Sequence, residues 1–306
     1  MKALVLDRPG KPDVLYLAEV DKPTPARGEV RVRVQAVGLN PVDYKLAATG
    51  YPGWKFPFIL GLDISGVIDA VGPDVDDWSE GDPVYYLGDL RRPGGYGQFT
   101  IASTQALAWM PENMNPVEAA ALPCAGFTAY QALYRKLRVQ KDRTILIHSG
   151  SGGVGSYAIQ LAKAAGLTVI ASCSAHNFEF VKRLGAEHTI DYKNSDVVAA
   201  VNAFTEGRGV DYILDSVSSE SARKCMDALA FGGEIACVAG LPDLTDVAPF
   251  QKAFSVHEIA LGAAYSSGDE LAIADLGRMG RELAALVAKS KIRPTVQEVI
   301  ALEEIP

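Results

Sequence analysis

The sequence predicts an α/β protein of two domains, in which an N-terminal β-barrel precedes a doubly wound parallel sheet. Residues 1–110 carry alternating apolar and polar strands between frequent turn signals, whereas residues 143–239 alternate apolar strands with helices. A chain of 306 residues is also longer than one hydrophobic core usually organises. Because alternating strands and helices form a parallel sheet with helices on both faces, the class follows from the second half of the chain.

The N-terminal domain opens with a strand in MKALVLDRPG, and its clearest strand is Glu29–Leu39. There valines and Ala36 alternate with arginines and Gln35, the period of two that is typical of a half-buried strand. Prolines and glycines mark closely spaced turns, which favours a small barrel over a parallel sheet. Asp89–Gly97 is predicted to be a loop that leads into a strand at Gln98–Ala102.

A helical segment at Asn115–Leu137 is expected to lead from the first domain to the second. Asn115 is a suitable N-cap, Pro116 suits the first helical position, and Glu118 completes a capping box. A break in the helix is predicted around Pro123–Gly126.

The second domain begins at Arg143 with an apolar strand, a glycine-rich turn and a helix rich in alanine and leucine. The elements after it are predicted as strand Leu167–Ser172, helix His176–Leu184, strand Thr189–Tyr192, helix Val197–Thr205, strand Val210–Asp215, helix Ser219–Ala230 and strand Glu234–Ala239. His257–Ala264 adds an edge strand, and Gly268–Ala288 is a long helix that returns to the first domain. The domains are therefore expected at residues 1–122, completed by 265–306, and at residues 123–264.

The turn HSGSGGVG has the spacing Gly150-x-Gly152-x-x-Gly155. The first glycine permits a sharp turn, the second lets backbone N–H groups approach a pyrophosphate, and the third lets the helix pack on its strand. The helix N-terminus adds partial positive charge. Since a strand precedes the motif and an amphipathic helix follows it, we predict a dinucleotide-binding Rossmann domain rather than an ordinary glycine-rich turn. The expected contacts are Gly150, Ser151, Gly152, Gly153, Val154 and Gly155.

Composition limits the classes of partner and metal site. The formal net charge of −8 argues against nucleic acid or an anionic membrane as the main partner. No run approaches the roughly 18 apolar residues that span a bilayer. The N-terminus shows no secretory signal, so we expect a cytoplasmic location. The four cysteines and four histidines are dispersed, which predicts reduced thiols and no metal-ligand cluster.

Several segments stand in a distinctive order: AVGLNPVDYKLAATG (36–50), FILGLDISGVIDAVG (58–72), GDPVYY, GGYGQF, ALPCAGFTAYQAL, HSGSGGVGSYAIQLAKAAG, GVDYILDSV (209–217) and FGGEIACVAGL (231–241). Together they resemble the zinc-free quinone oxidoreductase branch of the medium-chain dehydrogenase/reductase superfamily, over nearly the whole chain. The resemblance implies a GroES-like catalytic domain at the N-terminus and a Rossmann domain that binds NADP.

The resemblance also bears on zinc. Zinc-containing relatives have a cysteine ligand where this chain has Asn40, and a histidine followed by a glutamate in the segment that matches Leu62-Asp63. Cys124 lies near the position of a third ligand. One thiol cannot replace three protein ligands, so we expect no catalytic zinc. The loop Asp89–Gly97 also lacks the cysteines of the structural zinc lobe.

Members of this family usually continue beyond a segment like IALEEIP with a helix and a final strand of the barrel. An unpaired barrel edge would favour association, so we expect the native chain to continue beyond Pro306 rather than the barrel to close differently. Relatives commonly dimerise through the edges of their nucleotide-domain sheets. His257–Ala264 is therefore the expected interface of a homodimer.

NADPH is the expected cofactor. Rossmann proteins that prefer NAD usually place an acidic side chain about 20 residues beyond the glycines, at the end of the second strand. No acid occurs here between the glycine motif and Glu179. Ser172, Ser174 and Asn177 can donate hydrogen bonds to a 2′-phosphate that an acid would repel. The quinone reductases often have a lysine at the position of Asn177, and a lysine nearby in sequence is the alternative source of charge.

The resemblance implies further contacts to the cofactor. Tyr192 matches a tyrosine that packs near the adenosine phosphate, although a core aromatic is the alternative. Thr128 lies in a segment that meets the nicotinamide end. The remaining candidates follow the fourth and fifth predicted strands, at the carboxyl ends where open α/β sheets bind ligands; a plain turn role is the alternative for the glycine among them. They are Ser216, Val217, Gly240 and Leu241.

Without zinc, a quinone or a conjugated enone or enal is the natural hydride acceptor, because hydride addition at its β-carbon leaves a delocalised enolate. The protein then has to orient the substrate, donate hydrogen bonds to the developing oxyanion and exclude water. Asn40 is the first candidate donor, because the vacated ligand position should face the reacting end of the nicotinamide; a loop-fixing amide is the alternative. Tyr51 resembles a tyrosine at the pocket mouth and is a candidate proton or hydrogen-bond donor. Asp43 is expected to be a structural cap or ion-pair partner.

The expected function is therefore NADPH-dependent reduction of quinones or α,β-unsaturated carbonyls, with a small-molecule substrate and no nucleic acid or membrane partner. An enoyl-thioester reductase and a zinc-free alcohol dehydrogenase are alternatives within the enzymes, and a zinc-dependent alcohol dehydrogenase is disfavoured. A non-catalytic NADPH-binding protein is the alternative from another class. Arg91 and Arg92 are expected to be exposed loop arginines rather than a clamp for an anionic substrate.

Overall fold

The computed structural model describes residues 1–305. The chain divides into two compact units. The first comprises Met1–Phe127, Gly262–Lys289 and Pro294–Pro306, and the second comprises Thr128–Leu261 and Ser290–Arg293. These bounds differ by a few residues from the expected domains, and Pro306, the last residue of the expected segment 265–306, lies outside the described residues.

The first unit contains two antiparallel sheets. β1 (Lys2–Leu6), β2 (Tyr16–Glu19) and β4 (Phe58–Ile59) form one sheet in the order β2-β1-β4. The second sheet has the order β7-β3-β5-β6-β8 and consists of β3 (Glu29–Gly38), β5 (Asp63–Val71), β6 (Pro83–Leu87), β7 (Phe99–Ser103) and β8 (Ala108–Trp109). The predicted alternation in β3 is confirmed at Val30 and Val32, which are buried, while Arg33 and Gln35 are exposed.

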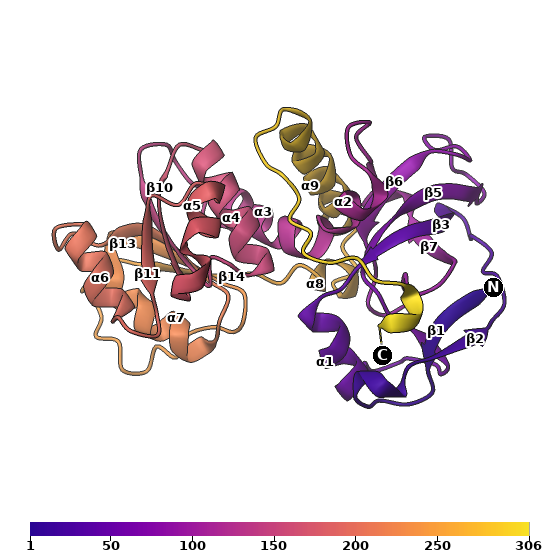
Figure 1. Ribbon diagram of the computed structural model, residues 1–306, viewed down its shortest axis with the longest axis horizontal. Helices are drawn as coiled ribbons and strands as arrows, with labels where there is room; N and C mark the ends of the chain where they lie inside the picture. Colours follow the sequence, from indigo (N-terminus) through magenta and orange to yellow (C-terminus); the bar gives the residue numbers. More distant parts are fainter. Residues whose placement is uncertain (306) are drawn as a thin grey trace. The chain divides into compact units, whose positions relative to one another are not determined.

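The α-helices of this unit within residues 1–305 are α1 (Pro41–Thr49), α2 (Pro116–Ala120), α8 (Ala263–Ser266) and α9 (Glu270–Ala288). α9 contacts β6 and β8, where the Tyr85 hydroxyl donates a hydrogen bond to the Gly280 carbonyl over 2.6 Å. The yellow C-terminal segment ends near β1 (Figure 1). There Leu302 and Ile305 pack against the cluster of Ala3, Leu4 and Val5, so residues from both ends of the chain share one core.

The second unit is a six-stranded parallel sheet in the order β11-β10-β9-β12-β13-β14. The strands are β9 (Thr144–His148), β10 (Thr168–Cys173), β11 (His188–Asp191), β12 (Val210–Asp215), β13 (Leu229–Cys237) and β14 (Ser255–Glu258), and the helices are α3 (Thr128–Tyr130), α4 (Gly153–Ala164), α5 (Phe178–Leu184), α6 (Val197–Phe204) and α7 (Ser219–Cys225). α4 contacts α5 and α6 contacts α7, and strands lie between the two pairs (Figure 1). The predicted doubly wound sheet is confirmed, and its strand order reverses between β9 and β12, where such sheets bind ligands.

Two predicted elements were wrong in detail. The edge strand expected at His257–Ala264 is β14, which spans Ser255–Glu258; a turn follows it, and Ala263 and Ala264 belong to α8, because a short apolar run does not distinguish strand from helix. The helix expected to continue to Ala230 ends at Cys225, and β13 begins at Leu229. The interruption predicted around Pro123–Gly126 is confirmed, because α2 ends at Ala120 and the chain continues from Pro123 in wider π-helical turns, Pro123–Phe127 and Gln131–Lys136.

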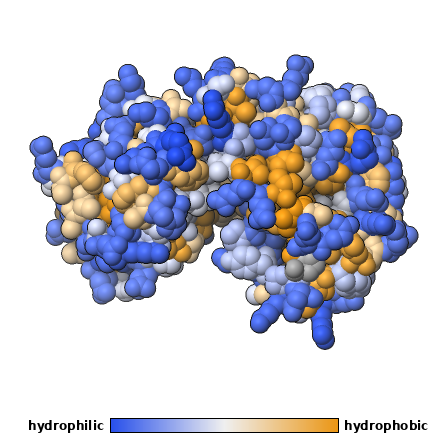
Figure 2. Space-filling view, in the orientation of Figure 1, coloured by the Kyte–Doolittle hydropathy of each residue, from blue (hydrophilic) through white to orange (hydrophobic). Residues whose placement is uncertain are grey.

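Hydrophilic residues cover most of the face in Figure 2, and apolar residues gather in a few patches. Within residues 1–305, no helix combines the length and hydropathy that crossing a membrane requires. All four cysteines are free thiols, and Cys173, Cys225 and Cys237 are buried.

Candidate functional site

The glycine-rich turn folds back sharply between β9 and α4. Ser149 follows β9 with a positive φ of 65°, a conformation that L-residues rarely adopt. The Gly150 N–H donates to the Ser172 carbonyl over 2.8 Å, which ties the turn to β10, and the Gly152 N–H donates to the Ser149 carbonyl over 3.0 Å. The turn is thus held by its own backbone and by the neighbouring strand.

The three motif glycines have different surroundings. A Cβ on Gly155 would lie 2.3 Å from the Ser149 carbonyl oxygen and 2.8 Å from the Gly150 Cα, so the fold itself requires glycine there. A Cβ on Gly150 would lie 2.9 Å from the Ala171 Cβ. A Cβ on Gly152 would meet only the two Ser149 oxygens, at 3.3 Å. The second glycine is therefore the one that packing requires least, as expected if it leaves room for a ligand.

The N-terminus of α4 has no side-chain cap in the described part of the chain. Its N-cap is Gly152, which has no side chain, and Gly153 in the first turn is exposed. The first-turn N–H groups and the helix dipole are therefore available to an anion such as a pyrophosphate.

Four of the predicted cofactor residues are linked beside this turn. The Asn177 Nδ2 donates to the Ser151 Oγ over 3.1 Å, and the Ser174 Oγ donates to the Tyr192 hydroxyl over 3.4 Å. Tyr192 is 47% exposed, so its ring is open to a ligand and is not a core aromatic.

Ser172 was predicted to contact the cofactor through its side chain, and the structure corrects this. The side chain is fully buried; its Oγ forms a short hydrogen bond with the His148 Nδ1 and accepts the Ser149 N–H over 3.3 Å. The Ser172 hydroxyl therefore stabilises the turn from the buried side and does not face a ligand. Thr128, the first residue of the second unit, is also buried, at 6% exposure.

The candidates at the ends of β12 and β13 lie on the carboxyl edge of the sheet. The Ser216 Oγ donates to the His148 carbonyl over 3.3 Å. Val217 and Leu241 are about half exposed and free to contact a ligand. Gly240 has a φ of 120°, and a Cβ there would lie 2.3 Å from the Ser219 Oγ, so the turn itself favours glycine at this position.

One cluster in this unit was missed at the level of sequence. His148, Asp215 and Cys225 bring their polar atoms within 4.8 Å of one another, although they come from three separate elements. The only signal was position: His148 and Asp215 end neighbouring strands and pair directly in the sheet. The dispersed spacing of the histidines and cysteines predicts no such grouping, so this cluster is one that sequence spacing does not reveal.

The surroundings of Asp215 nevertheless indicate a structural network. Its Oδ1 accepts the Val217 N–H over 2.9 Å, and its Oδ2 accepts the Ser221 hydroxyl over 2.5 Å, so a metal would have to displace existing hydrogen bonds. Burial raises the pKa of the Cys225 thiol to about 12 and lowers the pKa of His148. Both groups are therefore neutral at neutral pH, and the cluster fixes the loop after β12.

In the first unit, the structure brings together Asn40, Asp63 and Cys124, one residue from each of the three segments that the resemblance aligns with zinc ligands of relatives. The Asn40 Nδ2 donates to the Asp63 Oδ2 over 2.9 Å, and the Cys124 N–H donates to the Asp63 Oδ1 over 2.7 Å. The Asn40 backbone N–H donates to the Asp43 Oδ2 over 2.8 Å, which makes Asp43 a structural cap of α1, as expected.

The carboxyl groups of this cluster are buried. Asp43 is 5% exposed and Asp63 is 2% exposed. Burial raises the pKa of Asp43 to about 6 and, together with the nearby charge of Asp43, holds the pKa of Asp63 well above its ordinary value of 3.8. Burial likewise raises the pKa of the Cys124 thiol. These groups are protonated far more readily than exposed ones.

Tyr51 follows the C-cap of α1, where its ring centroid lies 6.4 Å from that of Trp54. Trp54 in turn stacks on Phe58 at 3.9 Å and donates its Nε1 to the Leu90 carbonyl over 2.8 Å. Within residues 1–305, no hydrogen bond or ring contact joins Tyr51 to Asn40 directly. The two predicted catalytic residues therefore occupy opposite ends of α1.

The loop arginines are already paired. The Arg91 Nε and Nη2 donate to the two Asp89 carboxylate oxygens over 2.9 and 2.8 Å, and the Arg92 Nη1 donates to the Glu29 Oε1 over 2.6 Å. The structure thus agrees with their interpretation as loop arginines rather than an anion clamp.

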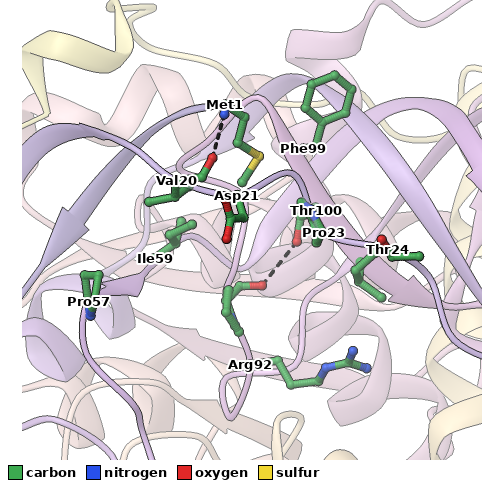
Figure 3. Close-up of a pocket in the computed structure, with 12 residues that line it drawn as sticks. Met1, Val20, Asp21, Pro23, Thr24, Pro57, Ile59, Arg92, Phe99 and Thr100 are labelled. Atoms are coloured by element: carbon green, nitrogen blue, oxygen red, sulfur yellow. Dashed lines mark hydrogen bonds between the residues drawn. The ribbon is translucent and has the colours of Figure 1, made fainter.

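A cavity of about 410 Å³ in the first unit lies elsewhere. Its walls carry Pro23, Pro57, Ile59 and Phe99, and hydrogen bonds from the Met1 amino group to the Val20 carbonyl and from the Thr100 hydroxyl to the Pro93 carbonyl brace it (Figure 3). None of the predicted site residues lines this cavity.

Comparison with known proteins gives two family matches. Residues 26–112 match the alcohol dehydrogenase GroES-like domain, and residues 153–275 match the zinc-binding dehydrogenase domain. The quinone oxidoreductase of Sus scrofa is 28% identical over 309 residues, covering 99% of this chain and 91% of that protein. The phthioceranic/hydroxyphthioceranic acid synthase of Mycobacterium tuberculosis is 31% identical over 85% of this chain, but the chain spans only 12% of that protein.

Solved structures agree with these matches. An alcohol dehydrogenase superfamily protein from Novosphingobium aromaticivorans has a TM-score of 0.87 and 31% identity, covering 96% of this chain and 88% of that one. The CurK enoyl reductase has a TM-score of 0.87 and 27% identity, covering 99% and 93%.

Proposed function

Because the chain belongs to the medium-chain dehydrogenase/reductase family, in its quinone oxidoreductase type, we propose that it is an NADPH-dependent oxidoreductase. It reduces quinones or α,β-unsaturated carbonyls by hydride transfer without zinc. The observation that carries the proposal is the turn at Gly150–Gly155, which leaves the second glycine open and the N-terminus of α4 uncapped.

The residues present fit a phosphorylated dinucleotide. The turn and the first-turn N–H groups of α4 would hold the pyrophosphate, and Ser174, Asn177 and Tyr192 would surround the adenosine phosphate. Thr128, Ser216, Val217, Gly240 and Leu241 would contact the rest of the cofactor. Bound there, NADPH would supply a hydride.

The preference for NADPH over NADH rests on the absence of a free acid near the described Ser174 and Asn177. Asp191 ends the neighbouring strand β11, but its carboxylate accepts the Lys193 N–H over 3.1 Å and the Asn194 Nδ2 over 2.6 Å. Its charge is therefore turned toward its own loop. Hydroxyl and amide donors remain for a 2′-phosphate.

The residues at the positions of zinc ligands do not fit zinc. Asn40 offers an amide and Leu62 an aliphatic side chain, whereas zinc prefers thiolates, imidazoles and carboxylates, so Asp63 and Cys124 alone are too few ligands. We propose instead that the Asn40 side chain donates a hydrogen bond to the oxyanion that develops on the substrate. The Tyr51 hydroxyl supplies a hydrogen bond or a proton.

The test is NADPH consumption by purified protein, followed with a panel of quinones, enones and enals. We expect oxidation of NADPH with at least one conjugated acceptor, faster than with NADH. Failure of every acceptor, despite tight binding of NADPH, would instead favour a non-catalytic binding protein.

The likeness to CurK favours a second candidate, an enoyl-thioester reductase, which the same assay tests when an enoyl thioester is included. A zinc-free alcohol dehydrogenase stays a further alternative. We also propose a homodimer formed through β14, the edge strand of the nucleotide-binding sheet. The cytoplasmic location stays a prediction.

A further inference from the structure

The side chain of Asn40 is turned away from the helix that it begins. Asparagine is among the best N-cap residues because its side-chain oxygen accepts an N–H of the first turn. Here the cap is formed in the other direction only, by the Asp43 Oδ2 and the Asn40 backbone N–H, while the Asn40 side chain forms no cap hydrogen bond. Its Nδ2 donates instead to the Asp63 Oδ2 over 2.9 Å.

We propose that Asp63 is a positioning residue that fixes the orientation of the Asn40 amide toward the substrate oxyanion. The inference rests on the function proposed above. An ionised carboxylate only accepts hydrogen bonds, so the nitrogen end of the amide must face Asp63. The Asn40 Oδ1 and one N–H of its Nδ2 then have no partner within residues 1–305, and both keep a fixed direction.

Asp63 is itself held rigidly. It begins β5, and its Oδ1 accepts the Cys124 N–H over 2.7 Å, so both carboxylate oxygens have donors. It pairs with Gly38 across the sheet. A Cβ on Gly38 would lie 2.9 Å from the Asp63 Cβ and 2.5 Å from the Ala120 carbonyl oxygen, which shows how closely the backbone surrounds it. The carboxylate therefore has little freedom to rotate.

The charged and titratable groups that face Asp63 are Asp43 on α1, Tyr96 in the loop between β6 and β7, and Cys124 in the π-helical turn. No cation appears among the groups that shift its pKa, and burial raises that pKa. A protonated Asp63 is able to donate to the Asn40 Oδ1, which would let the amide turn over. The orientation should therefore be lost as the pH falls, and activity with it.

The decisive variant is Asp63→Asn. Since both oxygens of Asp63 accept from fixed donors, the replacement must set its own NH₂ group against the Cys124 N–H or the Asn40 Nδ2, unless the Asn40 amide turns over. We expect kcat to fall about 100-fold, as for loss of one well-placed oxyanion donor. The Kd for NADPH, which concerns the second unit, should change by less than about twofold.

A double-mutant cycle separates positioning from a general structural role. If Asp63 acts through Asn40, Asp63→Asn should cause no further loss of kcat in an Asn40→Ala background. The double variant Asn40→Asp with Asp63→Asn exchanges the two side chains and restores a donor–acceptor pair. It should therefore recover the thermal stability that Asp63→Asn alone loses, but not its kcat. Asp82→Asn is the control, because the Asp82 side chain accepts only the Ser79 N–H, over 2.7 Å, within residues 1–305; it should leave thermal stability and kcat unchanged.

The pH dependence of kcat separates positioning from folding, because a variant that only folds less well would keep the pH profile of the wild type. We expect kcat of the wild type to decline on the acidic side and the Asp63→Asn variant to lose that limb. If the wild type turns over and Asp63→Asn has an unchanged kcat, or if the losses of the two single variants add in the double variant, the positioning role of Asp63 is wrong while the proposed function stands. A wild type that reduces no acceptor would overturn the proposed function, and the inference with it. The side-chain amide signal of Asn40 in an NMR spectrum, identified by its loss in Asn40→Ala, would still show whether Asp63 holds that group.

Discussion

The glycine turn offers the sharpest test because two of its glycines should fail in different ways. In Gly152→Ala the new Cβ lies 3.3 Å from two Ser149 oxygens, and the φ of −76° suits alanine. The stability of the fold should change by less than about 1 kcal/mol. The methyl group instead occupies the side from which phosphates reach the backbone. Loss of one charge-assisted hydrogen bond, about 1.5–3 kcal/mol, predicts NADPH binding weaker by about 10- to 100-fold.

In Gly155→Ala the new Cβ would lie 2.3 Å from the Ser149 carbonyl oxygen and 2.8 Å from the Gly150 Cα. These are backbone atoms of a turn whose other side is hydrogen-bonded to Ser172, so they cannot swing away as a flexible side chain would. Overpacking of this kind costs about 1–3 kcal/mol or more. This variant should unfold at a lower temperature than Gly152→Ala.

Both variants are measured by titration with NADPH, by calorimetry or by cofactor fluorescence, and by thermal unfolding without cofactor. The expected pattern is normal stability with weak binding for Gly152→Ala, and reduced stability for Gly155→Ala. Wild-type affinity in Gly152→Ala would refute the assignment of the phosphates to this turn. Wild-type stability in Gly155→Ala would refute the packing argument.

Four further predictions concern other residues. The pKa of Asp43 is about 6 in the fold against an ordinary 3.8, so the native state binds this proton more tightly than the unfolded chain does. This adds up to about 3 kcal/mol to the free energy of unfolding, an effect that is complete below about pH 4 and is lost as the pH rises through 6. Asp43→Asn should flatten this dependence in denaturant titrations across pH, and an unchanged slope would contradict it. Ser174→Asp should weaken NADPH binding about 10-fold or more while sparing NADH, because an acid repels the 2′-phosphate; equal loss for both cofactors would argue against the placement. Cys124→Ser, like treatment with a chelator, should keep turnover within about twofold, whereas metal analysis that finds one zinc per chain in an active enzyme would reverse the view of the site. The Ile259 N–H donates to Cys237, so alternation places the Glu258 N–H on the open edge of β14; Glu258→Pro should give a monomer in sedimentation, and a stable dimer would exclude this edge.

Sequence alone predicted the features that depend on local chemistry. The turn is determined by glycines at the required spacing, with a strand before them and a helix after them. Each of these features depends on residues that lie close together in the sequence. The alternation of β3 and the capping role of Asp43 are local in the same sense.

The corrections come from partners that lie far apart in the chain. Ser172 stands at the predicted place, but pairing of β10 with β9 turns its hydroxyl to His148 rather than to a ligand. His148, Asp215 and Cys225 meet only when three elements pack. Asn40 looks like a helix cap until Asp63, 23 residues later, takes its side chain. A buried acceptor at that distance leaves no local pattern.

The most direct test of the whole account is one turnover experiment with NADPH deuterated at C4 on the transferred side, a cyclic enone as acceptor and protein treated with a chelator. The account predicts reduced product with deuterium on its β-carbon. Product without deuterium, or turnover that appears only when zinc is restored, would contradict hydride transfer by a metal-free site.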